Sequence, residues 1–171
     1  NIYMSVVVNS DRAIELNKYG FPIDDISNWN MSKVTDIFAI FRNCSNVTSF
    51  SSLEKWDTSK ISKLSYAFQN CSGCSDFKFV ENWKMNSAEI VLGMFASCTF
   101  QSIDLSKWDT SKINNIRSLF EGNSNLTTVN FTNWKNPTKE QETLFGKQTS
   151  QQNAQTSTTT NEEDLANEQN N

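Results

Sequence analysis

The sequence predicts an α/β repeat solenoid, in which short parallel strands and helices stack in four full turns with a cap at each end. Two observations predict this fold. Tryptophans recur at a nearly constant spacing, and columns of apolar residues keep step with them. The chain has 171 residues, of which 37% are hydrophobic, and this size suits a single domain with a modest core.

The five tryptophans set the period of the repeat. Successive members of the series are 27, 27, 25 and 26 residues apart. A period of this length is typical of repeat architectures, in which each unit buries its apolar face against its neighbours. The series comprises Trp29, Trp56, Trp83, Trp108 and Trp134.

Apolar residues ahead of each tryptophan predict a short strand. In Ile103/Leu105 and in Val129/Phe131, a single polar residue separates two apolar ones. This alternation is typical of a strand with one buried face. We therefore expect one parallel strand in each turn, in a sheet whose other face is open to solvent.

Residues after each tryptophan predict a helix. A Ser or Asn three positions on is a suitable N-cap, and apolar residues then follow at helical spacing. In the first turn these are Val34, Ile37, Ile40 and Phe41. Each turn is thus expected to be a leucine-rich-repeat-like unit of strand, tryptophan corner, helix and return loop. Stacking would make a spine of the column Phe41, Phe68, Phe95 and Phe120.

Four regions are expected along the chain. Residues 1–22 are predicted to form an N-terminal cap or a degenerate repeat, and residues 23–135 the leucine-rich-type repeat solenoid. Residues 136–147, with Pro137 near the start and Gly146 near the end, are predicted to be a C-terminal capping helix. Residues 148–171 are almost wholly polar and are predicted to be a disordered tail, either a stalk or a segment without further role.

Whole turns of the chain resemble the BspA-like leucine-rich-repeat surface proteins, in particular their lipoprotein-associated repeat of about 25 residues. The resemblance rests on Trp-Asp-Thr-Ser-Lys-Ile at residues 56–61 and 108–113, and on Trp-Asn-Met-Ser-Lys-Val at residues 29–34. It covers residues 23–135, although the third turn departs from it with Trp-Lys-Met-Asn at residues 83–86. The resemblance implies a cell-surface or extracellular protein that binds host or matrix components, without catalytic residues.

Strand positions between the buried ones would point to the open face of the sheet, which is the usual binding surface of such stacks. Phe79 is the one large apolar residue in these columns and is a candidate hot spot for binding. A generic solubilising face is the alternative. The candidate ligand-binding residues are Asp25, Ser27, Ser52, Glu54, Phe79, Glu81, Asp104, Ser106, Asn130 and Thr132.

Cysteines and lysines also recur in columns. Cys44, Cys71 and Cys98 would lie within disulfide range in adjacent turns, but a ladder of buried thiols is the interpretation that we favour. Lysines four positions after three tryptophans indicate a solvated face, with a polyanion-binding stripe as the alternative. These lysines are Lys33, Lys60 and Lys112.

Composition argues against several functional classes. The chain has no His, which is the commonest general base and metal ligand. A lone C-x-x-C pair, Cys71 and Cys74, supplies two of the four ligands that zinc needs. A net charge of −4 leaves no basic footprint for nucleic acid, and no stretch approaches the ~18 apolar residues of a membrane span.

We therefore expect a non-enzymatic protein without cofactor or metal. Its expected partner is a protein or glycan ligand on another cell or in the matrix, bound through the exposed sheet in the manner of an adhesin. The alternative is a structural spacer or coat component of the cell surface without a specific ligand. The sequence leaves the oligomeric state open.

Overall fold

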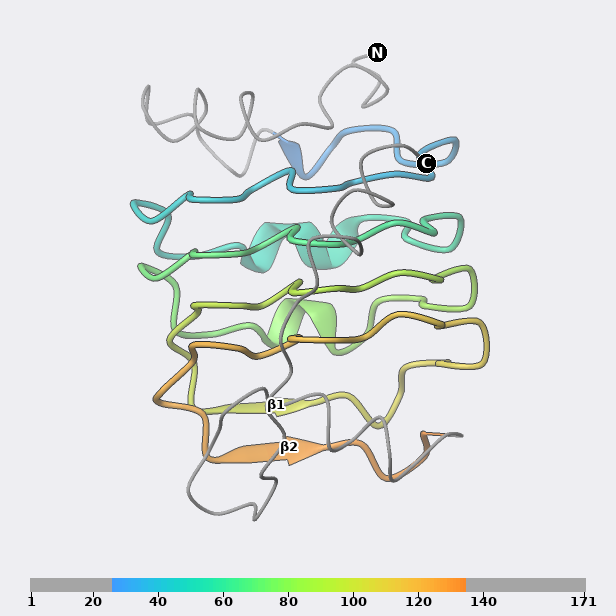
Figure 1. Ribbon diagram of the computed structural model, residues 1–171. Helices are drawn as coiled ribbons and strands as arrows, with labels where there is room; N and C mark the ends of the chain where they lie inside the picture. The colour runs from blue at the N-terminus through green and yellow to red at the C-terminus, as the bar shows by residue number, and fades with distance from the viewer. Residues whose placement is uncertain (1–25, 135–171) are drawn as a thin grey trace.

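The computed structural model describes residues 26–134, in which successive turns of the chain lie one above another (Figure 1). Each turn runs across the back of the stack, bends at one lateral edge and returns across the front. The predicted N-terminal cap, C-terminal capping helix and polar tail lie outside the described residues.

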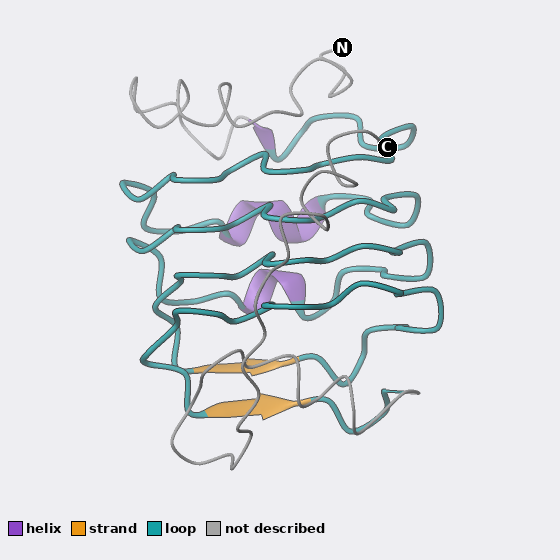
Figure 2. Ribbon diagram, in the orientation of Figure 1, coloured by secondary structure: helices purple, strands orange, loops and turns teal. Residues whose placement is uncertain are grey.

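The back of the stack holds the regular elements, which are all short (Figure 2). Two are 3-10 helices, η2 (Ser51–Lys55) and η3 (Lys78–Val80). Two are strands, β1 (Ser102–Asp104) and β2 (Thr128–Asn130), which pair in parallel with Ile103 opposite Val129. We call residues 51–55, 78–80, 102–104 and 128–130 the back segments.

The predicted α/β solenoid of leucine-rich-repeat-like strands and helices is wrong. Between residues 27 and 134 there is no α-helix, and the strands are limited to the two-stranded sheet of β1 and β2. The helices expected after the tryptophans are replaced by irregular front segments, residues 36–44, 63–71, 90–98 and 115–123, which cross the front of the stack.

Hydrogen bonds between turns explain the missing helices. An α-helical N–H would bond within its own segment to the carbonyl four residues back. Here Ile37 N–H instead donates to Lys63 O at 2.9 Å, and Leu64 N–H to Ile90 O at 2.9 Å. Parallel bridges join the four front segments in register, at Asp36↔Lys63, Lys63↔Ile90 and Ile90↔Asn115.

The front segments also contain residues that no α-helix accommodates. Each segment has two positions with positive φ, a region that L-residues enter at a cost. At the first of them, Ala39 has φ 53° and Gly93 has φ 57°. Ala39 is the third residue of a tight turn that Ile40 N–H closes on Ile37 O at 3.2 Å. The eight residues are Ala39, Asn43, Tyr66, Asn70, Gly93, Ser97, Ser118 and Gly122.

The predicted Ser N-caps are also wrong, because the segments that they would cap are not helical. Instead of accepting a hydrogen bond as a cap, the Ser residue donates one from its backbone N–H to the Asp side chain two residues earlier. Ser59 N–H donates to Asp57 Oδ1 at 3.1 Å, and Ser111 N–H donates to Asp109 Oδ1 at 3.0 Å. The Asp of the Trp-Asp-Thr-Ser segment therefore closes an Asx turn at the corner.

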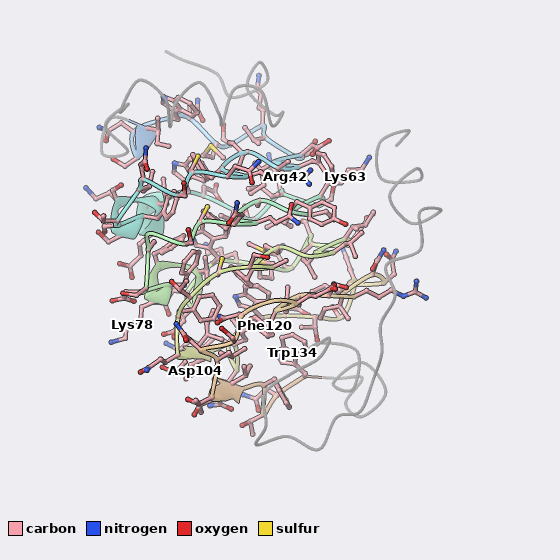
Figure 3. The ribbon with its side chains drawn as sticks, turned by 60° about the vertical axis from the view of Figure 1, so that its left-hand side comes forward. Arg42, Lys63, Lys78, Asp104, Phe120 and Trp134 are labelled. Atoms are coloured by element: carbon pink, nitrogen blue, oxygen red, sulfur yellow. The ribbon has the colours of Figure 1, made fainter. Side chains whose placement is uncertain are left out.

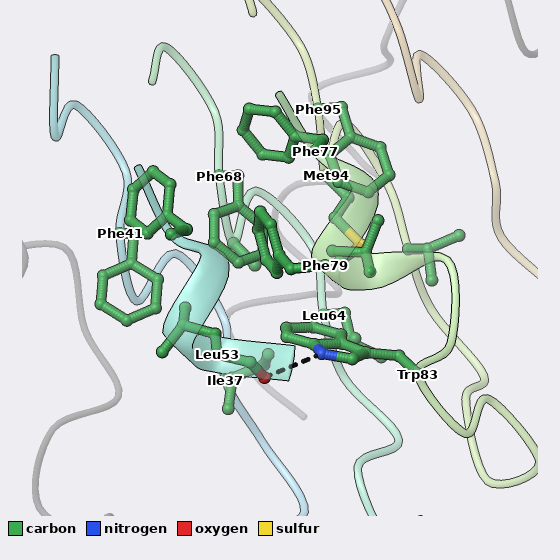
Figure 4. Close-up of a cluster of buried hydrophobic side chains, with 14 of the residues drawn as sticks. Ile37, Phe41, Leu53, Leu64, Phe68, Phe77, Phe79, Trp83, Met94 and Phe95 are labelled. Atoms are coloured by element: carbon green, nitrogen blue, oxygen red, sulfur yellow. Dashed lines mark hydrogen bonds between the residues drawn. The ribbon is translucent and has the colours of Figure 1, made fainter. Parts of the chain in front are cut away.

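Aromatic side chains fill the space between front and back (Figure 4). The predicted Phe spine is confirmed. Phe68 stacks on Phe41 with ring centroids 5.5 Å apart, and on Phe95 at 6.2 Å. Phe95 stacks in turn on Phe120 at 5.8 Å. Phe77, just ahead of η3, meets this spine edge-on, so the core is continuous from turn to turn.

Four of the five tryptophans tie their turn to the preceding one. The Trp83 indole N–H donates to Leu53 O at 3.1 Å, as Figure 4 shows, and Trp108 repeats this bond with Val80 O at 2.9 Å. Trp56 and Trp134 donate to Ile26 O and Leu105 O. The buried indole, which needs a hydrogen-bond partner, thus satisfies a backbone carbonyl of the neighbouring turn.

Turns differ in length on the side opposite the tryptophans. The distance from the Cys column to the apolar residue three before the next tryptophan varies, since Val80 comes nine positions after Cys71 but Leu105 comes seven positions after Cys98. The Trp108 bond nevertheless has the same form as the Trp83 bond. We call this side, residues 45–50, 72–77, 99–101 and 124–127, the return edge.

The left-handed positions give opposite stability predictions for a helix and for the observed turns. We expect Gly93→Ala to destabilise the protein by about 1–2 kcal/mol, because a Cβ there would lie 2.5 Å from Tyr66 Cε1. Ser97 is exposed and has φ 56°. We therefore expect Ser97→Gly to leave the stability of the protein unchanged or to raise it by up to about 1 kcal/mol.

Thermal and chemical denaturation of the two variants measures both changes. In an α-helix the two signs would be reversed, since Gly is about 1 kcal/mol less favourable than Ala there. A stabilised Gly93→Ala protein would therefore contradict the observed front segments.

Candidate functional site

Most of the predicted binding residues lie on the back of the stack. We define the back face as the exposed side chains of residues 51–55, 78–82, 102–107 and 128–133. Figure 3 shows Lys78 and Asp104 on this side, with Arg42 and Lys63 on the opposite side. Asp25 lies outside the described residues. Seven predicted residues are exposed or half-buried here: Ser52, Glu54, Glu81, Asp104, Ser106, Asn130 and Thr132.

Phe79, the predicted exposed hot spot, is buried in the core and is 4% exposed. Its ring centroid lies 5.3 Å from that of Phe68 and 5.7 Å from that of Trp83 (Figure 4). The reason is η3, in which the side chains do not alternate between two faces as in a strand. Phe79 and Val80 both point inward, while Lys78 is exposed.

Ser27, also predicted to face outward, is buried at 9% exposure. The first turn therefore contributes neither of its two predicted residues to the described back face. The face that remains is polar and extends from η2 to β2.

Side chains on the back face are hydrogen-bonded from turn to turn. Asn82 Nδ2 donates to Glu54 Oε1 at 3.3 Å, and Lys107 Nζ donates to Asn82 Oδ1 at 3.0 Å. Asp104 N–H donates to Glu81 Oε1 at 2.9 Å. Carboxylate, amide and ammonium groups are thereby held in fixed positions across three successive turns.

Sequence reasoning missed Asn82 and Lys107. Both directly precede a tryptophan, and the same column contains Lys55 and Asn133, all polar and exposed. The signal was therefore present in the repeat. Strand alternation hides this signal, because a position two residues after a buried one, such as Asn82 after Val80, would be assigned to the core face as well.

Two carboxylates near the tryptophans are fixed by Asx turns. The Ser59 hydroxyl donates to Asp57 Oδ1 at 2.6 Å, and this bond, with that of the Ser59 N–H, lowers the pKa of Asp57. Hydrogen bonds from Ser106 lower the pKa of Asp104 in the same way, where Ser106 N–H lies 2.9 Å from Oδ1. Both groups are accordingly carboxylates at neutral pH.

The four cysteines are buried thiols that are not joined in disulfides, so the disulfide alternative does not apply to the structure. Cys71 Sγ donates to Phe41 O at 3.0 Å, and Cys98 Sγ to Phe68 O at 3.2 Å. Burial raises the pKa of Cys44 and of Cys98 to about 12, and raises that of Cys71 and Cys74 as well. A protonated, buried thiol is a poor nucleophile.

Residues 26–134 contain neither a metal-ligand cluster nor a helix able to cross a membrane. Among these residues, no three or more Cys, Asp or Glu side chains gather in a way that could hold a metal ion. No helix within the same range has the length and apolar character to cross a membrane.

Comparison with protein families shows which family the chain belongs to. The family described as "Mycoplasma protein of unknown function, DUF285" matches residues 12–134 and, in an overlapping match, residues 45–159. The chain belongs to the DUF285 family. The DUF285 match includes every described turn of the stack. The chain matches none of the curated proteins and none of the solved structures.

The Asx turns of this DUF285 protein predict its response to acid. Folded-state pKa values of Asp57 and Asp104 lie below the unfolded value of about 3.9. Their stabilising contribution is therefore complete above about pH 5 and is lost as the pH falls through the folded values. We expect Asp57→Asn/Asp104→Asn to melt at a lower temperature than the parent at pH 7, where the carboxylates stabilise the fold, and to lose less stability on acidification, so that the two proteins converge at low pH.

The DUF285 chain supplies its own control for that substitution, since Asn30 occupies the Asp57 column and its Oδ1 accepts the Ser32 N–H at 3.0 Å. Asn should therefore keep the turn while removing the titration. Identical pH profiles of melting temperature between pH 7 and 2.5 would rule out this assignment.

Buried thiols predict slow chemical labelling. At pH 8, we expect a disulfide reagent such as DTNB to modify the folded DUF285 protein at least about tenfold more slowly than the urea-unfolded chain, because the thiolate is the reactive form. Absorbance at the wavelength of the released thiolate measures the rate. Fast labelling of the folded protein would show that the Cys column is open to solvent.

Proposed function

We propose that this DUF285 protein is a non-catalytic binding module of the cell surface, which engages a protein or glycan ligand on another cell or in the matrix. The DUF285 family is associated with BspA-like repeat surface proteins. The repeated Trp-Asp-Thr-Ser-Lys segments at residues 56–60 and 108–112 support placing the chain among them.

The observation that carries the proposal is the hydrogen-bonded polar row on the back face. Glu54, Asn82 and Lys107 come from three successive turns and hold one another at 3.3 Å and 3.0 Å. Such a row offers donors and acceptors in positions that are fixed before a ligand arrives. Fixing them in advance reduces the entropy that binding would otherwise cost.

The absence of His from the sequence supports a non-catalytic role. The thiols, which are the strongest nucleophiles in the chain, are buried and have raised pKa values. The remaining polar groups of the back face act by hydrogen bonding and charge, as is typical of recognition.

One observation favours a structural spacer as the second candidate. Phe79 is buried, so the back segments lack the aromatic anchor that dominates many binding hot spots. A ligand of the back face would therefore be recognised through polar contacts. A spacer would need the same polar row only for solubility.

Arrays of glycans and matrix proteins, probed with the full chain, test the proposal. We expect binding that falls at least about tenfold in Glu54→Ala/Glu81→Ala/Asn82→Ala, since several polar contacts of ~0.5–1.5 kcal/mol each are removed. The matched control is Glu89→Ala/Glu121→Ala/Asn114→Ala, which changes the same residue types and the same net charge away from the back face.

Both variants must keep the parent circular dichroism spectrum and melting temperature. Equal losses in the two variants would contradict a ligand site on the back face. Arrays that stay blank, with the chain displayed on the cell surface, would favour the spacer.

A further inference from the structure

Lysines gather along the lateral edge where the chain turns after each tryptophan. We define the lysine edge by the positions from one before to four after each of the first four tryptophans. Every lysine at these positions is exposed. The set comprises Lys33, Lys55, Lys60, Lys84, Lys107 and Lys112.

The lysine edge is held in register by bonds between corners. Besides the indole bonds, Lys84 N–H donates to Thr58 Oγ1 at 2.9 Å, and the Thr58 hydroxyl donates to Lys84 O at 3.2 Å. The Ser87 hydroxyl donates to Ser59 O at 2.6 Å. Adjacent turns in parallel pairing lie roughly 4.8 Å apart, so exposed lysines recur along the stack at the corner of each of four successive turns.

Negative charge at this edge is sparse. Two carboxylates, Asp57 and Asp109, share the corner positions with the six lysines, whereas the whole chain has a net charge of −4. Asp57 is engaged by Ser59 and lies near Lys84 and Lys60, whose charges also lower its pKa. Glu54 and Glu81 belong to the back face and come two residues before Trp56 and Trp83, just ahead of the edge. The edge is thus the cationic strip of an anionic protein.

We propose that the lysine edge binds a linear, highly sulfated polysaccharide laid along the stack. A row of like charges repels itself, and a chain with closely spaced sulfates neutralises several members of the row at once. Lysine presents a compact point charge, which suits a flexible anionic chain without fixed bidentate geometry. Hydroxyl and amide groups between the lysines, on Ser59, Ser111 and Asn86, offer partners for sugar hydroxyls.

The observations favour a polysaccharide over nucleic acid. Single-stranded nucleic acid binds where aromatic rings accept its bases. All five tryptophans are buried, at 2–9% exposure, so the indoles at the corners are not available for stacking. Arg, which reads phosphate bidentately, is missing from the defined edge positions.

Heparin immobilised on a sensor surface, with the full chain in solution at about 50 mM salt, tests the proposal. We expect saturable binding that weakens steeply as salt rises. Lys33→Gln/Lys60→Gln/Lys112→Gln should bind at least about tenfold more weakly. The matched control, Lys63→Gln/Lys78→Gln/Arg117→Gln, removes the same charge away from the edge and should bind like the parent.

Three results would overturn the proposal: no heparin binding by the full chain, equal losses in the two variants, or tighter binding to single-stranded DNA that the edge variant abolishes. Hyaluronan, a carboxylated chain without sulfate, should bind more weakly than heparin, and the reverse order would overturn the sulfate assignment. The edge variant leaves every residue of the back face unchanged, since Lys33, Lys60 and Lys112 lie outside it, so a loss of heparin binding in that variant tests the lysine edge separately from the proposed function.

Discussion

The structure depends on where the backbone N–H groups of the front segments find their acceptors. Alternate N–H groups donate to the following turn, as Ile37 does to Lys63 O, so hydrogen bonding runs along the stack and each turn is incomplete without its neighbour. The tryptophan indoles add a second bond of the same kind in the other direction, from each turn to the one before. Order along the stack therefore comes from polar bonds as well as from burial of the aromatic core.

Much of the packing could be predicted from the sequence, but the backbone conformation could not. The columns placed Phe68 between Phe41 and Phe95, and the tryptophans at one corner, because burial follows the repeat whatever the local backbone. The spacing of Val34, Ile37, Ile40 and Phe41 fits a helix, yet it also fits tight turns that bury the same side chains. Residues with positive φ exclude the helix and favour the tight turns. Ala39, Tyr66 and Ser118 have positive φ, but their residue types do not predict it.

The candidate site shows the same limit. Glu54 and Glu81 were placed on the open side correctly, since a charged side chain avoids the core in any conformation. Phe79 was misplaced because its assignment depended on strand alternation, which a 3-10 helix does not obey. Residues whose position follows from their own chemistry could thus be located, and those whose position follows from local geometry could not.

The uneven return edge has a consequence for how such a chain changes over generations. Segments of seven and of nine positions connect equivalent columns, while the corner bonds keep the same form. Insertions and deletions are accordingly tolerated on one side and resisted on the other. A gene for this protein could gain, lose or duplicate a complete repeat by recombination, because the loops of the return edge accommodate differences in length. The surfaces near the indoles would then diverge by point substitution alone.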